Sequence, residues 1–400
     1  MDTIHFKVEP AEIISASKTE EKIKERMVQG KSRCCSNGSF TVWSVLAECI
    51  RSLSDTSYTV HGYPITDLAK EVGAMNIINE KTALEYALGG SLLKKRSVVI
   101  VKNVGMNALA DPLVMASTQG LIGGVVLISG DDAEAKGTQN RQDTRPYAEV
   151  ASIPLIEIDT DDIYHSLEGA FIESERYSRV ALLRTTDIIL YSESKEQEIP
   201  STPKERQYGN LVNKAFTTKG CADYADRLFK GEGDGPETTE NIGYTLSLCR
   251  NCPYKPLLKY ISDEGIDVII DTGCIFLARK KPYCIGVANY GLGSSIAVAA
   301  KSTGIAIIGD YAFLHSGINS LIDVYERGTP LLTIILKNGR LGMTGGEKCI
   351  DVTKYISWAE PRKVEVEEAI EILKGPLNGP KTIIIETECP EGEVHEKVRY

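Results

Sequence analysis

Short runs of apolar residues alternate with helical segments along most of this chain. The runs SVVIV (97–101), VVLIS (125–129) and LTIIL (332–336) are rich in β-branched residues and lack the polar alternation of a half-exposed strand. Strands of this kind are buried on both faces, and the intervening helices connect them as parallel neighbours. The pattern therefore predicts an α/β fold with mainly parallel sheets flanked by helices.

This alternation is interrupted once, and the interruption divides the chain. Residues 193–240 are polar and rich in Gly, Pro and Glu, which is typical of a linker. Residues 39–192 and 241–400 each hold a set of strands and helices, and a shift of 207 residues superposes a strand pair of one on a strand pair of the other. We expect two related domains. Residues 1–38 are charged and predict a solvated polar extension.

Charge and cysteine content narrow the class of protein. The formal net charge of -10 argues against a nucleic acid or an anionic membrane as partner. No apolar run approaches the roughly 18 residues of a membrane span, and the start MDTIHFKVEPAE is too charged for a secretory signal. Ten cysteines without such a signal indicate a reducing compartment, where thiols are ligands, catalysts or core residues. A cytoplasmic location is expected.

Two polar residues follow neighbouring predicted strands in the second half. Asp310 ends the strand IAIIG, Asn338 ends LLTIILK, and a helix capped by Ser316 and stopped at Gly328 lies between them. A right-handed strand–helix–strand unit brings both to one sheet edge. Their side-chain oxygens and the carbonyl of Arg340 are ligands suited to Mg²⁺ with bound phosphates. Alternatively, Asp310 only caps the helix and Asn338 lies in an ordinary turn.

Three other features are candidates for chemistry. The glycines of YGLGSS, residues 290–295, precede a helix and let its backbone approach an anion. Glu80 opens a helix after the strand MNIIN, where it either takes part in catalysis or only favours the positive helix terminus. Cys249 and Cys252 form a CxxC pair that suits a redox pair, half a zinc site or part of an iron–sulfur cluster.

The surroundings of this pair leave two interpretations. No clear strand precedes it, as a thioredoxin-like pair would need, and no second CxxC completes a zinc ribbon. Cys274 and Cys389 each lie at the end of a predicted strand. The four cysteines are therefore either scattered cluster ligands or structural, buried thiols.

A family resemblance connects these features. The segments GDYAFLHSGINSLI, ILKN and MTG resemble the thiamine-diphosphate-binding domain of the indolepyruvate ferredoxin oxidoreductase alpha subunit family. The resemblance implies that Asp310, Asn338 and the main chain of Arg340 hold Mg²⁺. It also implies that a further set of residues contacts thiamine diphosphate: Gly291, Gly293, Ser294, Gly309, His315 and Met343.

The first half resembles the same family, so that the match covers roughly residues 55–400. NEKTALEYALGG is similar to a stretch of the pyrimidine-binding domain, which implies that Glu80 activates the cofactor by bonding its N1′ nitrogen. HGYPITDLAKE is similar to a substrate loop and nominates Thr66 as a contact of the substrate carboxylate. TQNRQDTRPYAEV nominates Arg145 for an anionic group, although a surface arginine explains it equally well.

The resemblance also assigns domains and cysteines. Residues 39–192 become the pyrimidine-binding domain and residues 241–400 the diphosphate-binding domain. In related ferredoxin oxidoreductases a CxxC, a later GC and a cysteine near the domain end hold one [4Fe–4S] cluster. This order implies the same role for Cys249, Cys252, Cys274 and Cys389.

Some residues depart from the family pattern. Asn103 stands in place of a His, Lys337 in place of an Asp, and GGEK in place of a His-Gln-Pro run. We also expect the protein to lack the ferredoxin-like domain with which the family's alpha subunit continues. These departures question the aryl-pyruvate substrate more than they question the cofactor.

The combined prediction is oxidative decarboxylation of a 2-oxoacid of the indolepyruvate type by a thiamine-diphosphate-dependent enzyme. Electrons would pass to ferredoxin or an iron–sulfur partner, and a homo-oligomer, a beta subunit or both would complete the assembly. The first alternative is a non-oxidative decarboxylase of an acid such as sulfopyruvate. The second is a non-catalytic paralogue that binds thiamine.

Overall fold

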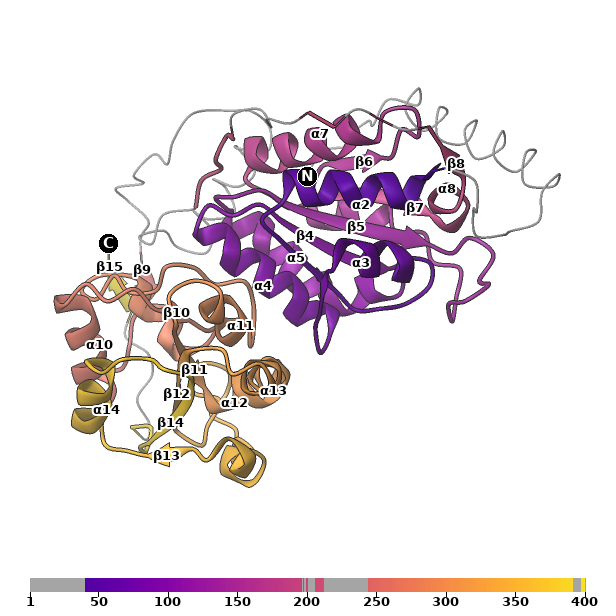
Figure 1. Ribbon diagram of the computed structural model, residues 1–400. Helices are drawn as coiled ribbons and strands as arrows, with labels where there is room; N and C mark the ends of the chain where they lie inside the picture. The colour runs from indigo at the N-terminus through magenta and orange to yellow at the C-terminus, as the bar shows by residue number, and fades with distance from the viewer. Residues whose placement is uncertain are drawn as a thin grey trace.

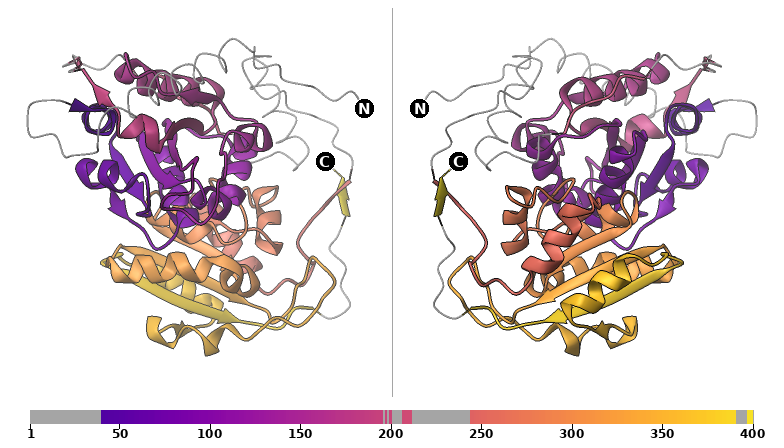
Figure 2. Two further views of the ribbon diagram at one scale, coloured as in Figure 1. Left: turned by 90° about the vertical axis from the view of Figure 1, so that its right-hand side faces the viewer. Right: turned by 90° about the vertical axis from the view of Figure 1, so that its left-hand side faces the viewer.

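The computed structural model of the protein describes residues 40–195, 197, 199–200, 206–211, 244–390 and 397–399. The predicted extension over residues 1–38 and most of the predicted linker over residues 193–240 lie outside the described residues. The described chain forms two α/β units, each built on one parallel sheet (Figures 1 and 2). The predicted mixed α/β fold with parallel sheets is thereby confirmed.

The first unit is built on a parallel sheet of six strands in the order β3-β2-β4-β5-β7-β6. Residues alternate between its faces, so that Val98 and Ile100 contribute to one core while Val99 and Val101 contribute to another. The strands are β2 (Thr56–Thr59), β3 (Met75–Asn76), β4 (Ser97–Lys102), β5 (Val125–Asp131), β6 (Leu155–Glu157) and β7 (Ala181–Thr186).

Helices cover both faces of this sheet. One core includes α2 (Val42–Leu53), α3 (Thr66–Val72) and α7 (Ile163–Tyr177). The opposite core includes α4 (Glu80–Leu92), α5 (Gly105–Gln119) and α6 (Pro146–Ala151). The short elements at the margin are β1 (Phe40–Thr41), α8 (Asp187–Leu190) and β8 (Glu193–Ser194).

The second unit has a parallel sheet of five strands in the order β10-β11-β12-β14-β13. The helices α10 (Lys255–Asp263) and α14 (Val366–Leu373) share a core with one face. The helix α11 (Ser295–Ala300) lies on the other face. The strands are β10 (Ile269–Ile270), β11 (Ile305–Gly309), β12 (Leu331–Lys337), β13 (Arg362–Lys363) and β14 (Pro380–Glu386).

Short elements complete this unit. The elements η1, η3 and η4 are short 3-10 helices, and β9 pairs with β15 in an antiparallel ladder. These elements are β9 (Tyr244–Leu246), η1 (Cys274–Arg279), η3 (Val352–Lys354), η4 (Ser357–Ala359) and β15 (Lys397–Arg399).

The helical segment after β11 begins earlier than the sequence predicts. It runs without a break through α12 (Asp310–Ala312), a π-helical turn η2 (Phe313–Gly317) and α13 (Ile318–Glu326). The prediction that Ser316 caps a helix is therefore wrong. Asp310 starts the segment directly at the strand end, and the Ser316 hydroxyl, now inside it, donates to the Leu292 carbonyl at 2.6 Å.

The two units pack against each other through α4 and α11, which lie side by side in Figure 1. The core on this side is continuous, because residues of α4, such as Leu84 and Leu88, belong to the same cluster as Ile296 and Leu321 of the second unit. A single chain therefore brings the helix that starts at Glu80 onto the unit that carries Asp310. None of the helices in the described part of the chain has the length and apolar character that a membrane span requires.

Candidate active site

Asp310 and Asn338 lie at the same edge of the second sheet, as the strand order predicts. β11 and β12 are paired in parallel, with Gly309 opposite Leu336, so both polar residues follow at the carboxyl ends. The Asp310 side chain is buried, and its Oδ2 accepts the amide of Gly339 at 2.9 Å. Burial raises the pKa of Asp310, while hydrogen bonds from nearby main-chain amides oppose that rise.

The loop after Asn338 folds back over this carboxylate. Its two arms meet where the Cys349 amide donates to the Gly339 carbonyl at 2.8 Å. The Cys349 thiol bonds to the carboxylate of Asp310, and burial together with that negative charge raises the pKa of Cys349 to about 11. A protonated thiol is a weak nucleophile. The sequence did not predict that Cys349 lies beside Asp310, the predicted metal ligand. The glycines Gly345 and Gly346 at the loop tip are the signal that the chain turns back here.

Asn338 and Arg340 form the near arm of this loop. The Asn338 Oδ1 accepts the amide of Arg340 at 3.0 Å, which holds the side chain against its own turn. Lys337, which replaces an expected Asp, is occupied elsewhere: its Nζ lies 3.1 Å from Asp351 and 2.5 Å from Glu386. That substitution therefore adds an ion pair beside the loop.

The helix start after the YGLGSS segment is already occupied by a protein carboxylate. Asp271, which is fully buried, accepts the amide of Gly293 at 2.8 Å and that of Ser295 at 3.0 Å. The Gly293 amide is thus used within the protein in this conformation, and the contact of Gly293 with the cofactor stays a prediction. A side chain at position 293 is also excluded sterically, because an added Cβ would lie 2.1 Å from the Ser316 Oγ.

The remaining residues predicted to contact the cofactor lie just before α11, at the end of β11, in the π-helical turn and in the loop after β12. Gly291 adopts a φ of 109°, and Ser294 donates its hydroxyl to the Gly291 carbonyl at 2.9 Å. His315 is exposed on the π-helical turn, with its ring centroid 6.1 Å from that of Tyr311. Met343 is 37% exposed at the loop, and Gly309 has no atom within 4 Å of a hypothetical Cβ.

Glu80 is the first residue of α4 and lies partly buried. Its neighbour Asn79 caps the helix by accepting the amide of Thr82 at 2.8 Å, which fixes where the helix begins. The Glu80 carboxylate lies over Gly105 at the start of α5: a Cβ added to Gly105 would lie 2.7 Å from its Oε1. The absence of a side chain at Gly105 therefore makes room for this carboxylate.

Further polar contacts join α4 to the second unit. The hydroxyls of Thr82 and Ser320 lie 3.0 Å apart, so the first turn of α4 lies on the first turn of α13. Glu85 is buried beside Lys81, with Oε1 and Nζ 3.0 Å apart. Burial raises the pKa of Glu85 to about 7, although the Lys81 ammonium opposes this.

The two predicted substrate contacts of the first unit have local partners. The Thr66 hydroxyl donates to the Gly62 carbonyl at 2.9 Å, in the turn that starts α3. Arg145 forms a hydrogen-bonded ion pair with Asp143 at 2.6 Å, and its side chain is 40% exposed. Asn103, which replaces an expected His, is buried and donates to the carbonyls of residues 140 and 142.

Two of the four predicted cluster cysteines, Cys274 and Cys389, border the same glycine. Around Gly342, a hypothetical Cβ would lie 3.2 Å from the Cys274 Sγ and 3.8 Å from the Cys389 Sγ. Burial raises the pKa of Cys274 to about 12, and the nearby thiols of Cys389, Cys252 and Cys249 add to the rise. No group of three or more His, Cys, Asp or Glu in the described ranges converges on a single-ion position.

These thiols also adjoin the predicted metal ligands. The hypothetical Cβ of Gly342 would lie 3.9 Å from the Asn338 Nδ2 as well. A side chain at position 342 would therefore meet both the cysteines and Asn338.

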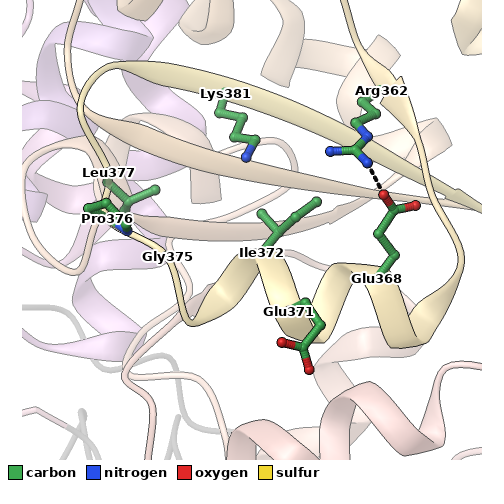
Figure 3. A pocket seen from close by; sticks show the side chains of 8 residues that line it. All are labelled: Arg362, Glu368, Glu371, Ile372, Gly375, Pro376, Leu377 and Lys381. Atoms are coloured by element: carbon green, nitrogen blue, oxygen red, sulfur yellow. Dashed lines mark hydrogen bonds and ion pairs between the residues drawn. The ribbon is translucent and has the colours of Figure 1, made fainter.

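A groove of about 400 Å³ elsewhere on the second unit involves none of these residues. It lies between α14 and the strands β13 and β14, and an ion pair joins Arg362 to Glu368 at one end of it (Figure 3). Half of the residues that line it are charged, and a turn at Gly375 and Pro376 closes one side. The groove offers no convergent site for an anionic cofactor.

Comparison with known proteins gives an independent view of the same residues. A family model described as thiamine pyrophosphate enzyme, C-terminal TPP binding domain, matches residues 268–371. The indolepyruvate oxidoreductase subunit IorA of Methanothermobacter thermautotrophicus is 35% identical, over 72% of this chain and 71% of that protein. IorA of Pyrococcus horikoshii is 34% identical over 33% of this chain, and that match spans only 21% of the relative's length.

A solved structure supports the fold. The thiamine diphosphate-dependent 4-hydroxybenzoylformate decarboxylase of Rhodococcus jostii RHA1 superposes with a TM-score of 0.59 at 12% identity. The superposition covers 88% of this chain and 100% of that one. At this identity the likeness concerns the fold alone.

Proposed function

Because the chain belongs to the family of indolepyruvate oxidoreductase subunit IorA, we propose that it is a thiamine-diphosphate-dependent enzyme that oxidatively decarboxylates a 2-oxoacid. The observation that carries the proposal is the packing of α4, which starts at Glu80, on the unit whose sheet edge holds Asp310 and Asn338. The first unit is then the pyrimidine-binding domain and the second the diphosphate-binding domain.

The residues at the second sheet edge fit a magnesium–diphosphate group. A buried carboxylate at Asp310 and an amide oxygen at Asn338 are hard oxygen donors, and the Arg340 carbonyl is close in sequence to both. We assign these three to Mg²⁺. Gly309, His315 and Met343 lie around the same edge and would border the diphosphate.

Glu80 fits the role of the activating carboxylate. It is partly buried at a helix start, and Gly105 leaves it room to face a ligand. Thiamine diphosphate, when bound, supplies the carbon that adds to the keto group and allows carbon dioxide to leave. The contribution of Glu80 is to hold a proton at the N1′ nitrogen, and its partial burial would strengthen that hydrogen bond.

The cysteine group fits an iron–sulfur cluster better than a single ion. A [4Fe–4S] cluster takes one thiolate on each of four irons, so its ligands surround a cube and do not converge on one point. Two of the four sulfurs, those of Cys274 and Cys389, border Gly342, and all three other thiols contribute to the raised pKa of Cys274, which supports this arrangement. A cluster held by Cys249, Cys252, Cys274 and Cys389 would provide an exit for electrons next to Asn338.

The substrate and the partners follow from the family name and remain part of the proposal. We assign an indolepyruvate-type 2-oxoacid as substrate, with Thr66 and Arg145 as contacts for its carboxylate. The Arg145–Asp143 ion pair would have to open for this. Electrons would pass to ferredoxin or an iron–sulfur partner, and the enzyme would act as a homo-oligomer, with a beta subunit, or both.

Anaerobic purification followed by cofactor, iron and magnesium analysis tests the proposal. We expect iron-containing protein that reduces a low-potential dye when a 2-oxoacid, most readily an aryl pyruvate, is added with thiamine diphosphate and Mg²⁺. Iron-free protein that releases carbon dioxide without reducing the dye would replace the oxidoreductase by a non-oxidative decarboxylase. Protein that neither binds the cofactor nor turns over any 2-oxoacid would contradict the proposal.

A further inference from the structure

We propose that Asp323 is the positioning residue that holds Glu80 in register with the metal-binding edge of the second unit. This inference rests on the proposed function, because it concerns how the two ends of the cofactor site are kept at a fixed separation within one chain. Asp323 does not itself contact the proposed cofactor residues.

The Asp323 carboxylate is a buried acceptor between the two units, only 5% exposed. Its Oδ1 accepts the main-chain amide of Ile78 at 3.1 Å, and its Oδ2 accepts the hydroxyl of Tyr86 at 2.9 Å. Arg327, which directly follows α13, balances the charge with its Nε 2.6 Å from Oδ2. A second guanidinium nitrogen of Arg327, Nη2, lies 3.2 Å from Oδ1, so that each carboxylate oxygen accepts two hydrogen bonds from donors with defined positions.

The two partners from the first unit lie on either side of Glu80. Ile78 is two residues before it, in the connection from β3 to α4, and Tyr86 is six residues after it on α4. One carboxylate therefore attaches the segment that carries Glu80 at both ends. Arg327 adds a third attachment, because its guanidinium also donates to the carbonyl of Asn76.

Asp323 belongs to the helical segment that starts at the metal-binding edge. That segment runs without a break from Asp310, the proposed metal ligand, to Glu326. Glu80, through Asp323, and Asp310 are therefore both attached to one continuous helical segment. A shift of this segment would move both residues together. Placement errors of about 1 Å in a catalytic group cost about a hundredfold in rate, so this link matters for activation.

A test needs a measurement closer to Glu80 than turnover. We suggest the exchange of the cofactor's C2 proton with deuterium, followed by NMR at saturating thiamine diphosphate and Mg²⁺, together with the cofactor Kd from fluorescence titration. Asp323→Ala is expected to slow exchange at least tenfold while changing the Kd less than threefold. Asp323→Asn keeps one acceptor for the Ile78 amide and is expected to lie between Asp323→Ala and the wild type.

The matched control is Tyr290→Phe. The Tyr290 hydroxyl donates to the Gly120 carbonyl at 2.9 Å, a buried bond between the same two units of the same length as the Tyr86–Asp323 bond. Gly120 follows the far end of α5, roughly 20 Å from Gly105 at a rise of about 1.5 Å per residue. This variant should lose stability without slowing exchange.

Four outcomes of these measurements are decisive. Wild-type exchange in folded Asp323→Ala would overturn the inference, and so would equal slowing in Tyr290→Phe, which would indicate only general loosening. If Asp323→Ala does not fold, unchanged exchange in both Asp323→Asn and Tyr86→Phe overturns it instead. Wild-type exchange in Glu80→Gln would show that the proposed function has failed, whatever Asp323 does.

Discussion

Replacing Gly105 by alanine separates the stability of the protein from its proposed activity. An added Cβ would lie 2.7 Å from the Oε1, 2.9 Å from the Cγ and 3.1 Å from the Cδ of Glu80. Ordinary contact begins at 3.4 Å, so these atoms must move by roughly 0.3 to 0.7 Å. They belong to the flexible end of a side chain, so we expect the Glu80 side chain to rotate while the backbone stays in place. A displacement of this size predicts a 10- to 100-fold loss of activation.

Stability should respond in a different way. Alanine is favoured over glycine in a helix by up to about 1 kcal/mol, and an off-rotamer Glu80 costs about 0.5 to 1.5 kcal/mol. The free energy of unfolding of Gly105→Ala should therefore stay within about 1 kcal/mol of the wild type.

Two assays read these effects independently. Urea unfolding gives the stability, and deuterium exchange of the cofactor's C2 proton gives the activation. Gly169→Ala is the matched control, because Gly169 lies in α7 with no atom within 4 Å of its hypothetical Cβ. That control should leave exchange unchanged. Wild-type exchange in Gly105→Ala would refute the reasoning that Glu80 acts from its position over Gly105.

Three further predictions concern single side chains. Glu80→Gln should still bind thiamine diphosphate but slow C2-proton exchange at least a hundredfold in the same NMR assay; equal rates would remove Glu80 from the mechanism. Cys274→Ser should lower the iron content and visible absorbance of anaerobically purified protein, while Cys284→Ser, at an exposed thiol, should not; iron retained in both would exclude the proposed ligand. Burial raises the pKa of Glu85 to about 7 from 4.5, so the folded protein binds this proton more tightly than the unfolded chain. The contribution of Glu85 to the free energy of unfolding is therefore complete below about pH 4.5 and is lost as the pH rises through 7. Urea unfolding between pH 5 and 8 should show that the wild type loses up to about 3 kcal/mol relative to Glu85→Gln. Parallel pH profiles would contradict this.

The sequence predicts the sheets well because the signals for them are local. The run LTIIL is apolar on both faces wherever it folds, and it forms the buried strand β12 beside β11. The juxtaposition of Asp310 and Asn338 follows from the same local rule, since parallel strands place their carboxyl ends at one edge.

Contacts between distant segments are not predictable in this way. Nothing near YGLGSS in the sequence indicates that Asp271 accepts the Gly293 amide from 22 residues away. The bond from Cys349 to Asp310 depends on a loop that folds back, and the start of the helical segment at Asp310 depends on its packing. Single-chain periodicity contains no information on which polar group satisfies another across the fold.

The role of Asp323 is of the same kind. Its helix pattern shows an acidic residue among apolar ones, but only the packing of α13 on α4 reveals which amide it accepts. Position, and not residue type, therefore distinguishes the carboxylates that we propose to act in catalysis from those that stabilise the fold.

The most direct test of the central claim is a calorimetric titration with thiamine diphosphate, with and without Mg²⁺, of wild type and Asp310→Ala. We predict saturable, Mg²⁺-dependent binding to the wild type and a loss of at least a hundredfold in affinity for Asp310→Ala, because its buried carboxylate is the proposed metal ligand. Absence of binding to the wild type, or equally tight binding to Asp310→Ala, would contradict the account.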